Sequence, residues 1–497
     1  ALPISPGEQL GSVVQFRDPA KNEMAWAKSS GLSTFLLAQG AGVFQQILLS
    51  QIQEGDEDGD DPNWQRPGTG SRGSVSGRSS GASADASLFR ENRKLGEGAF
   101  GVVLLVTATQ TRAGVVAGNR YAMKILDKKK FEAQRIVRYA YGERNVLKAA
   151  KHPFLIQLHC AFEVLVPSPQ WILVMEFAPG GSLYEKIIRE GKPGLPGDSC
   201  RRYAAEILEG LSYLHKRNII YRDLKPENVV LSVRDHCKIT DFGLAKMDVD
   251  VRGAQSYVGS HGYAAPEVGK TRYTSAVDLF SLGVTLFMMT SGGISRRHGG
   301  TDERSPVMNL HDLVWQLQLH LPEPGGGPTR FDMLIAIPRQ ACKDGVSIVS
   351  RARSRQAAGD FEAAWLSELQ EDLNTLVQRA PGIATILAEH GWTPATHPGT
   401  EGGFTGPPDL KALRKALYPP AVAVRLDVDA VDLMLTLTNR SVVARGTDES
   451  TKRHKFFAGI DWDSLVPSDE LAASEAAETQ QSAQEGGPSA SWSFAGP

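Results

Sequence analysis

The sequence has few cysteines, little net charge and almost no long apolar run. Only four cysteines occur among 497 residues, and no two of them form a C-x-x-C pair, which disfavours a structural zinc site or a disulfide framework. The 54 Lys and Arg residues nearly balance the 56 Asp and Glu residues, for a formal net charge of −2. This balance provides no general field for binding nucleic acid. We therefore expect a protein of the reducing cytoplasm or nucleus that binds no nucleic acid.

One uncharged stretch, Gly31–Ser50, is nearly long enough to cross a bilayer. Its glutamines and internal glycines are expensive or helix-weakening in a membrane. We interpret it as a packing helix or a partner-binding segment, and we do not expect membrane association. The chain begins with Ala1, so the absence of a targeting signal at this end is weak evidence.

The texture of the sequence predicts five parts. Residues 1–53 form an N-terminal segment of unspecified fold, and residues 54–87 are acidic and then rich in Ser and Gly, which is typical of a flexible linker. Residues 88–178 and 179–465 carry the strand-like and helix-like patterns of two folded regions. Residues 466–497 are acidic and rich in Ala, Ser and Gln, which predicts a disordered tail.

The stretch around which the chain is organised is YRDLKPEN, Tyr221–Asn228. It holds a carboxylate (Asp223), a cation (Lys225) and an amide (Asn228) within six residues, between two strand-like apolar runs. These groups suit phosphoryl transfer, in which a carboxylate accepts a hydroxyl proton, a lysine neutralises charge on the transferred group, and an asparagine oxygen binds Mg²⁺. An ordinary turn is the alternative for this stretch alone, because Asp, Pro and Asn all favour turns.

A glycine cluster, LGEGAFGVV, spans Leu95–Val103 in the pattern G-x-G-x-x-G-x-V. Glycine lets backbone N–H groups approach phosphate oxygens, because no Cβ stands in the way. The pattern alone also fits a ligand-free hairpin or a dinucleotide-binding turn. A β-branched stretch follows the cluster where the dinucleotide fold would have a helix, which favours a phosphate-binding hairpin.

Further motifs follow at regular spacings. Helical texture covers Lys128–Leu147, strand-like runs lie at Phe154–Leu158 and Trp171–Phe177, and a long amphipathic helix is predicted at Ser199–Lys216. The motifs are YAMK ending at Lys124, ERNVL beginning at Glu143, DFG beginning at Asp241 and APE ending at Glu267. Their order resembles the catalytic domain of the eukaryotic protein kinases. The resemblance implies an α+β, bilobal fold: a small antiparallel β-sheet with one helix, a hinge near Met175–Ala178, and a larger, mainly helical lobe with an insertion.

The resemblance also implies ATP and Mg²⁺ as cofactors and a role for each motif residue. The implied catalytic residues are Asp223, Lys225, Asn228, Lys124 and Glu143, of which the last two form an ion pair. The implied Mg²⁺ ligands are Asn228 and Asp241. The implied nucleotide contacts are Leu95, Gly96, Gly98, Gly101, Val103, Ala122, Lys124, Glu176, Ala178 and Val230.

Local features narrow the resemblance to serine/threonine kinases of the AGC group, which includes the cAMP-dependent and G-protein-coupled-receptor kinases. Tyr221 stands where most kinases have His, and KRHKFFAGIDWDSL at Lys452–Leu465 is similar to the end of an AGC catalytic domain. The resemblance covers roughly Phe89–Met288 and Val428–Leu465. It implies transfer of the γ-phosphate of ATP to Ser or Thr hydroxyls of protein substrates in signalling, under the control of an upstream kinase.

The sequence also departs from that family. Residues 291–425 are longer than usual and suggest an insertion, either a surface elaboration or a docking module. Ser256, placed before APE, is the candidate regulatory phosphosite, with Arg222 and Lys246 as its basic partners and the uncharged Tyr139 at the helix position that often adds a third contact.

In the pattern of the cAMP-dependent kinases, acidic residues at three positions bind arginines upstream of the phosphorylated residue. The resemblance places Ser182, Glu227 and Met288 at these positions, so only one carboxylate remains. We therefore expect a weakened preference for upstream Arg. No F-x-x-F motif follows Leu465. The rival interpretation is a pseudokinase that acts as a scaffold, against which stands the presence of every catalytic motif residue.

Overall fold

The protein is represented by a computed structural model. It describes residues 13–18, 23–28, 86–98, 101–134, 136–165, 168–190, 194–249, 253–292, 310–322, 327–359, 362–393, 401–422 and 424–465. The segments Gly31–Ser50, 54–85 and 466–497, about which the sequence made predictions, lie outside the described residues. Within residues 1–53 the structure describes a hairpin of β1 (Val13–Asp18) and β2 (Glu23–Lys28).

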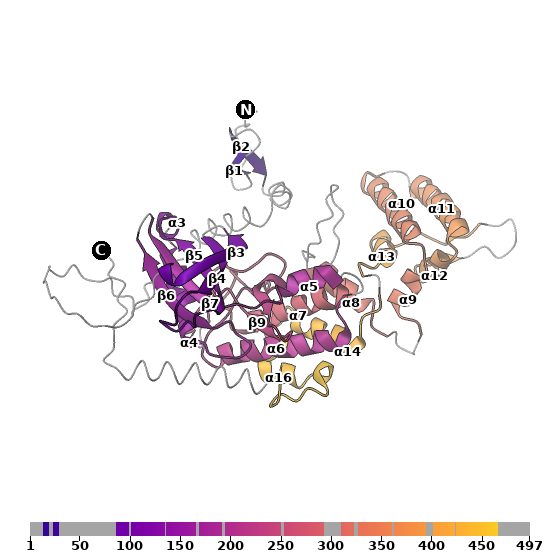
Figure 1. The fold of residues 1–497 in the computed structure, drawn as a ribbon. Coiled ribbons are helices and arrows are strands. Elements are labelled where there is room, and N and C mark those ends of the chain that lie inside the picture. Colours follow the sequence, from indigo (N-terminus) through magenta and orange to yellow (C-terminus); the bar gives the residue numbers. More distant parts are fainter. Residues whose placement is uncertain are drawn as a thin grey trace, which may run out of the picture.

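A five-stranded antiparallel sheet forms the smaller lobe (Figure 1). In spatial order its strands are β3 (Phe89–Gly98), β4 (Gly101–Ala108), β5 (Arg120–Asp127), β7 (Gln170–Glu176) and β6 (Leu158–Val164). Alternate residues of β5, including Tyr121 and Met123, are buried in a core on one face of the sheet. Period-two alternation therefore turns Ala122 and Lys124 to the other face.

Strand packing requires glycine at position 101, whether or not this hairpin binds a phosphate. A Cβ at this position would lie 1.8 Å from the carbonyl oxygen of Ile125 on β5, and any side chain would force the two strands apart. The close approach of β4 to β5 therefore depends on this glycine.

The helical texture at Lys128–Leu147 forms two helices where one continuous segment was expected. α3 (Lys128–Ala133) is capped by Asp127, whose carboxylate accepts the N–H groups of Lys129 and Lys130. α4 (Val137–Ala149) then follows after a break. The two helices contact each other, α3 packs on β7 and α4 packs on β6, and α4 carries Glu143.

Phe154–Leu158 is not a strand, so that prediction was wrong. Leu155 makes only a single parallel bridge to Ile239, and β6 begins at Leu158. Phe154 and Leu155 are buried, so the apolar run reflects a buried connection rather than an extended strand.

Helices build the larger lobe around α6 (Gly197–His215) and α7 (Ala276–Ser291), which pack against each other. The other elements of this lobe are α5 (Leu183–Glu190), β8 (Val229–Leu231), β9 (Cys237–Ile239), α8 (Leu310–Gln318), α14 (Val428–Leu437), α15 (Val442–Arg445) and α16 (Asp448–Lys452). The short β8–β9 hairpin lies beside α6 and carries the segment that leads to Asp241. An α+β fold of two lobes is confirmed.

A second core lies at the end of the larger lobe away from the sheet (Figure 1). It is built from α9 (Arg330–Ile335), α10 (Arg339–Ala357), α11 (Glu362–Arg379), α12 (Gly382–Ala388), β10 (Trp392–Thr393), β11 (Gly403–Phe404) and α13 (Leu410–Ala416). Its buried residues run from Leu319 to Leu417, whereas Leu313 and Leu317 of α8 belong to the main core. Within the expected insertion, 291–425, the separate core thus begins after α8.

Among the described residues, no helix combines the length and the apolar character needed to cross a membrane.

Candidate active site

Asp223 is the centre of the loop between α6 and β8. Its Oδ2 accepts hydrogen bonds from Lys225 Nζ at 3.0 Å and from Asn228 Nδ2 at 2.8 Å. Asn228 Nδ2 also donates to the carbonyl oxygen of Asp223 at 2.9 Å. Because the amide nitrogen closes the loop in this way, its oxygen is the atom left to bind a cation. Burial lowers the pKa of Lys225, but the charge and hydrogen bond of Asp223, together with the charges of Asp241 and Glu227, raise it above its ordinary value.

The sequence analysis did not name Ser260, which completes this cluster. Its Oγ donates to Asp223 Oδ1 at 2.6 Å and lies 2.6 Å from Lys225 Nζ. The only sequence signal was a hydroxyl placed shortly before the APE motif. Ser260 therefore holds the carboxylate and the ammonium in a fixed arrangement.

Asp278 of α7 fixes the backbone of the catalytic loop from below. Its carboxylate accepts the N–H groups of Tyr221 at 2.8 Å and Arg222 at 2.7 Å, and His215 Nε2 lies 2.9 Å away. Arg222 adopts the left-handed conformation, with φ of 69°, which a non-glycine residue adopts only when its surroundings enforce it. The fully buried Asp278 provides that enforcement.

Phe242 of the DFG motif is fully buried and packs edge-on against Tyr221, with ring centroids 5.6 Å apart. The Tyr221 hydroxyl donates to the carbonyl oxygen of Thr240 at 2.5 Å. The tyrosine at this position thus joins the catalytic loop to the DFG segment. Asp241 follows with φ of 58°, a second left-handed non-glycine residue.

Lys124 of β5 brings three distant motifs together. Its Nζ lies 2.6 Å from Glu143 Oε1 on α4 and 3.0 Å from Asp241 Oδ1. Burial opposes the charge of Lys124, but Asp241 and Glu143 raise its pKa above the ordinary value. Lys124 in turn lowers the pKa of Asp241. The Asp241 side chain is 44% exposed, so this carboxylate remains open to a ligand from the cleft.

The predicted nucleotide residues lie on five strands and the connection between the lobes. Leu95, Gly96 and Gly98 are on β3, Gly101 and Val103 on β4, Ala122 and Lys124 on β5, Glu176 at the end of β7, Ala178 just after it, and Val230 on β8. Val103 pairs with Lys124, and Ala122 with Met175. In β8, Val229 and Leu231 are buried, whereas Val230 is partly exposed. The Val230 side chain can therefore contact one face of a planar ligand.

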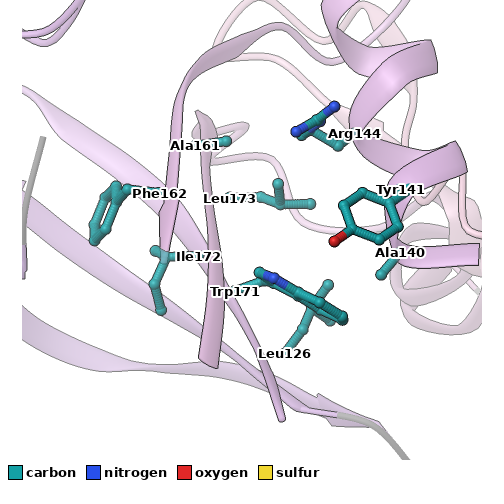
Figure 2. A pocket seen from close by; sticks show the side chains of 9 residues that line it. All are labelled: Leu126, Ala140, Tyr141, Arg144, Ala161, Phe162, Trp171, Ile172 and Leu173. Carbon is teal, nitrogen blue, oxygen red and sulfur yellow. The ribbon is translucent and has the colours of Figure 1, made fainter. Parts of the chain in front are cut away.

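The helix that carries Glu143 is held by aromatic packing (Figure 2). The Trp171 ring of β7 lies 5.4 Å from the ring of Tyr141 and 5.9 Å from that of Phe131. Trp171 and Tyr141 line a cavity of about 10 Å³, which is far too small for a nucleotide. The aromatic packing around the cavity therefore holds α4 in place. None of the residues that line the cavity is a predicted nucleotide residue.

Ser256 is buried next to Arg222. Arg222 Nη1 donates to Ser256 Oγ at 3.0 Å and to the Tyr273 hydroxyl at 3.1 Å. Lys246, the other predicted basic partner, pairs through its backbone with Ile220. Burial raises the pKa of Tyr139, and the charges of Arg138 and Arg222 partly offset this effect. Tyr139, the residue of α4 in this cluster, is therefore uncharged.

A buried ion pair missed by the sequence analysis holds the APE motif. Arg445 of α15 is fully buried and lies 2.7 Å from Glu267 Oε1. Arg445 also donates to the carbonyl oxygens of Ala276 and Asn439. The two partners are 178 residues apart, so no local pattern could reveal them.

Comparison with known proteins agrees with this geometry. Residues 89–332 match the family described as the protein kinase domain. The chain is 34% identical over 276 residues to human ribosomal protein S6 kinase alpha-2, an alignment that covers 54% of this chain and 36% of that protein. It is 37% identical over 242 residues to ribosomal protein S6 kinase alpha-6 of Danio rerio, covering 48% and 31% of the two chains.

A third relative is the serine/threonine-protein kinase SCH9 of Candida albicans, with 40% identity over 211 residues, covering 41% of this chain and 25% of that protein. The chain therefore spans about a third or less of the length of these relatives.

Proposed function

We propose that this chain, which contains a protein kinase domain of the AGC serine/threonine type, transfers the γ-phosphate of ATP to Ser or Thr hydroxyls of protein substrates. The observation that carries the proposal is the meeting of Lys124 with Glu143 at 2.6 Å and with Asp241 at 3.0 Å. A lysine held between a carboxylate on a helix, Glu143, and a carboxylate that can bind a metal ion, Asp241, is well placed to bind the phosphates of a nucleotide.

The residues at the cleft fit Mg²⁺ bound together with ATP. Asp241 offers a partly exposed carboxylate of lowered pKa, and Asn228 offers an amide oxygen. Mg²⁺ prefers oxygen ligands and is commonly held by one or two protein groups together with substrate phosphates. When bound, Mg²⁺ would neutralise charge on the phosphate oxygens. Among the described residues, no cluster of three or more His, Cys, Asp or Glu side chains forms a separate metal site.

We assign the steps of transfer to the chain's own residues. Asp223 orients the acceptor hydroxyl and takes its proton as the hydroxyl oxygen forms a bond to the γ-phosphorus and the bond to the β-phosphate oxygen breaks. Lys225, close to Asp223, stabilises charge on the moving phosphoryl group. Lys124 positions the phosphates, and the products are ADP and the phosphorylated protein.

We assign adenine binding to the sheet and the connection between the lobes. In this proposal Val103 and Ala122 cover the adenine from above, and Val230 supports it from below. The backbones of Glu176 and Ala178 bind its edge. Leu95 and the glycines of the β3–β4 hairpin cover the phosphates.

We further propose that an upstream kinase phosphorylates Ser256, giving Arg222 a charged partner. Because Ser256 is 9% exposed, the part of the chain around it, between the DFG and APE motifs, must open before the modification occurs. Substrate choice follows from Glu227 as the one retained acidic position, with weak selection for upstream Arg. We propose a cytoplasmic or nuclear location, consistent with four free cysteines at the described positions.

Phosphotransfer to a panel of serine, threonine and tyrosine peptides, with labelled Mg-ATP and the purified chain, tests this function. We expect label on serine and threonine peptides, and none on peptides with only tyrosine. The Lys124→Met variant should lose the activity, since the phosphates lose their cation. A wild-type protein that binds Mg-ATP yet transfers no label, even after incubation with active upstream kinases, would favour the scaffold interpretation.

A further inference from the structure

Lys238 is a buried cation at the junction of the two lobes. It lies on β9 and is 5% exposed. Its Nζ lies 3.0 Å from Glu176 Oε1 and donates to the carbonyl oxygen of Pro153 at 2.7 Å. A buried ammonium is costly unless it is paired and hydrogen-bonded, and both conditions are met here. The sequence analysis assigned no role to Lys238.

One partner of Lys238, Glu176, belongs to the proposed adenine site, and the other, Pro153, lies in the segment that precedes β6. Glu176 is the last residue of β7, where the chain leaves the smaller lobe. In the β8–β9 hairpin of the larger lobe, Lys238 stands directly opposite Val230. Asp241 follows three residues later. The Lys238 side chain therefore connects β7, which ends at the hinge, with the β8–β9 hairpin, which carries Val230.

The segment 152–157 completes this junction. The N–H of Ile239 donates to the carbonyl oxygen of Phe154 at 2.8 Å, and the N–H of Ile156 donates to the carbonyl oxygen of Ile239 at 2.9 Å. The N–H of Glu176 donates to the carbonyl oxygen of Gln157 at 2.9 Å. Backbone bonds thus join β9 to this segment and the segment to the hinge, while Lys238 spans both.

Loss of the ammonium would change the hinge more than the rest of the fold. The Glu176 carboxylate would keep only a long contact of 3.4 Å from the N–H of Gln157. At 27% side-chain exposure, it would turn toward water to recover solvation. The backbone hydrogen bonds through the segment 152–157 would remain, but the side-chain link between Glu176 and β9 would be lost, so we expect Glu176 and Val230 to be held less firmly relative to each other.

We propose that Lys238 is a positioning residue for the adenine of ATP, acting through Glu176 and Val230. The inference rests on the proposed function, because it assumes that the cleft binds ATP. It concerns the base: Lys238 binds Glu176 of β7 and Pro153 of the segment 152–157, whereas the proposal assigns the phosphates to Lys124 and the β3–β4 hairpin. We therefore expect the binding of the phosphates not to depend on Lys238.

The test compares two ligands, Mg-ATP and inorganic tripolyphosphate with Mg²⁺, by calorimetric titration of the full chain. We expect Lys238→Met to weaken Mg-ATP binding about tenfold, which corresponds to the loss of about 1.4 kcal/mol, and to leave tripolyphosphate binding unchanged within about twofold. Lys238→Arg should recover most of the affinity because it retains the charge. Glu176→Gln, a change at a partly exposed side chain, should reproduce the ATP-selective loss if Lys238→Met proves unstable.

Lys128→Met is the matched control. Lys128 also has a side chain with low exposure, 19%, and a carboxylate partner, Glu163, at 2.9 Å, but it lies at the start of α3. Its replacement should affect neither ligand. Equal weakening of both ligands by Lys238→Met, or no weakening, would overturn the inference alone. A wild-type chain that binds neither ligand would overturn the proposed function as well.

Discussion

His215 lies between Asp448 of α16 and Asp278, the residue that supports the catalytic loop, and this arrangement leads to a prediction of how the stability of the fold depends on pH. His215 Nδ1 lies 2.8 Å from Asp448 Oδ2, while its Nε2 lies 2.9 Å from Asp278 Oδ2. The imidazole is 5% exposed and lies between the two carboxylates. Burial alone would lower the pKa of His215, but the two acids raise it from 6.5 to about 9. The charged imidazolium therefore joins α16 to the residue that supports the catalytic loop.

The size of the effect follows from that difference. A native pKa about 2.5 above the unfolded value corresponds to roughly 3 kcal/mol of stability. Because the native pKa is the higher one, this stability is fully present below pH 6.5 and is lost as the pH rises through about 9. Asp448→Asn removes one of the two charges, so we expect it to reduce the free energy of unfolding by roughly 1–2 kcal/mol at pH 6.5.

Urea unfolding of the wild type and of Asp448→Asn at pH 6.5 and pH 9.5 measures this effect. The difference in unfolding free energy between the two proteins should shrink at pH 9.5, where the wild-type histidine is largely neutral. Glu449→Gln is the control on the same helix: its side chain is 61% exposed and pairs with Lys216 at 3.5 Å, so its loss should matter little at either pH. Equal destabilisation by Asp448→Asn at both pH values would refute the charged-histidine account.

Two further predictions concern the active site. Ser260→Ala removes the hydroxyl that bonds both Asp223 and Lys225. It should lower kcat by about tenfold to a hundredfold, the effect of one hydrogen bond to a charged group. The KM for ATP should be unchanged and Ser260→Thr should retain activity, whereas steady-state kinetics showing a changed KM with normal kcat would contradict the assignment. Phosphatase treatment should reduce the activity of the wild type but not that of Ser256→Ala. An equal loss in both proteins, measured by peptide phosphorylation, would remove Ser256 from the regulation.

The parts of the site that the sequence predicted are those whose chemistry is carried by motifs. Lys124 and Glu143 were expected to pair, and they lie 2.6 Å apart. Asp223, Lys225 and Asn228 were expected to cooperate, and they share hydrogen bonds within one loop. In each case the residue types and their spacing specify a known local arrangement, so a single sequence was sufficient.

The parts that the sequence missed are contacts between residues far apart in the chain. His215 and Asp448 are separated by 233 residues, and Arg445 and Glu267 by 178. Hydrophobic periodicity identifies a helix and its apolar face, but it does not say which other helix covers that face. For the same reason the sequence indicated an insertion at 291–425 but not the second core that α11 shares with α10 and α13.

Two errors in secondary structure have local causes. The run Phe154–Leu158 is apolar because Phe154 and Leu155 are buried in a connection, and burial without strand pairing gives the same pattern. The sequence at Lys128–Leu147 contains few helix breakers, yet the chain leaves the helical conformation after Ala133. Intrinsic propensity is a weak guide where tertiary packing selects the turn.

The measurement that tests the central claim most directly is a comparison of wild type and Asp223→Asn in both phosphotransfer and Mg-ATP binding. If Asp223 is the acceptor of the hydroxyl proton, the variant should lose about 10²-fold to 10⁴-fold in kcat while its Kd for Mg-ATP stays within about threefold. A variant that transfers phosphate as fast as the wild type would contradict the proposed catalytic role of Asp223.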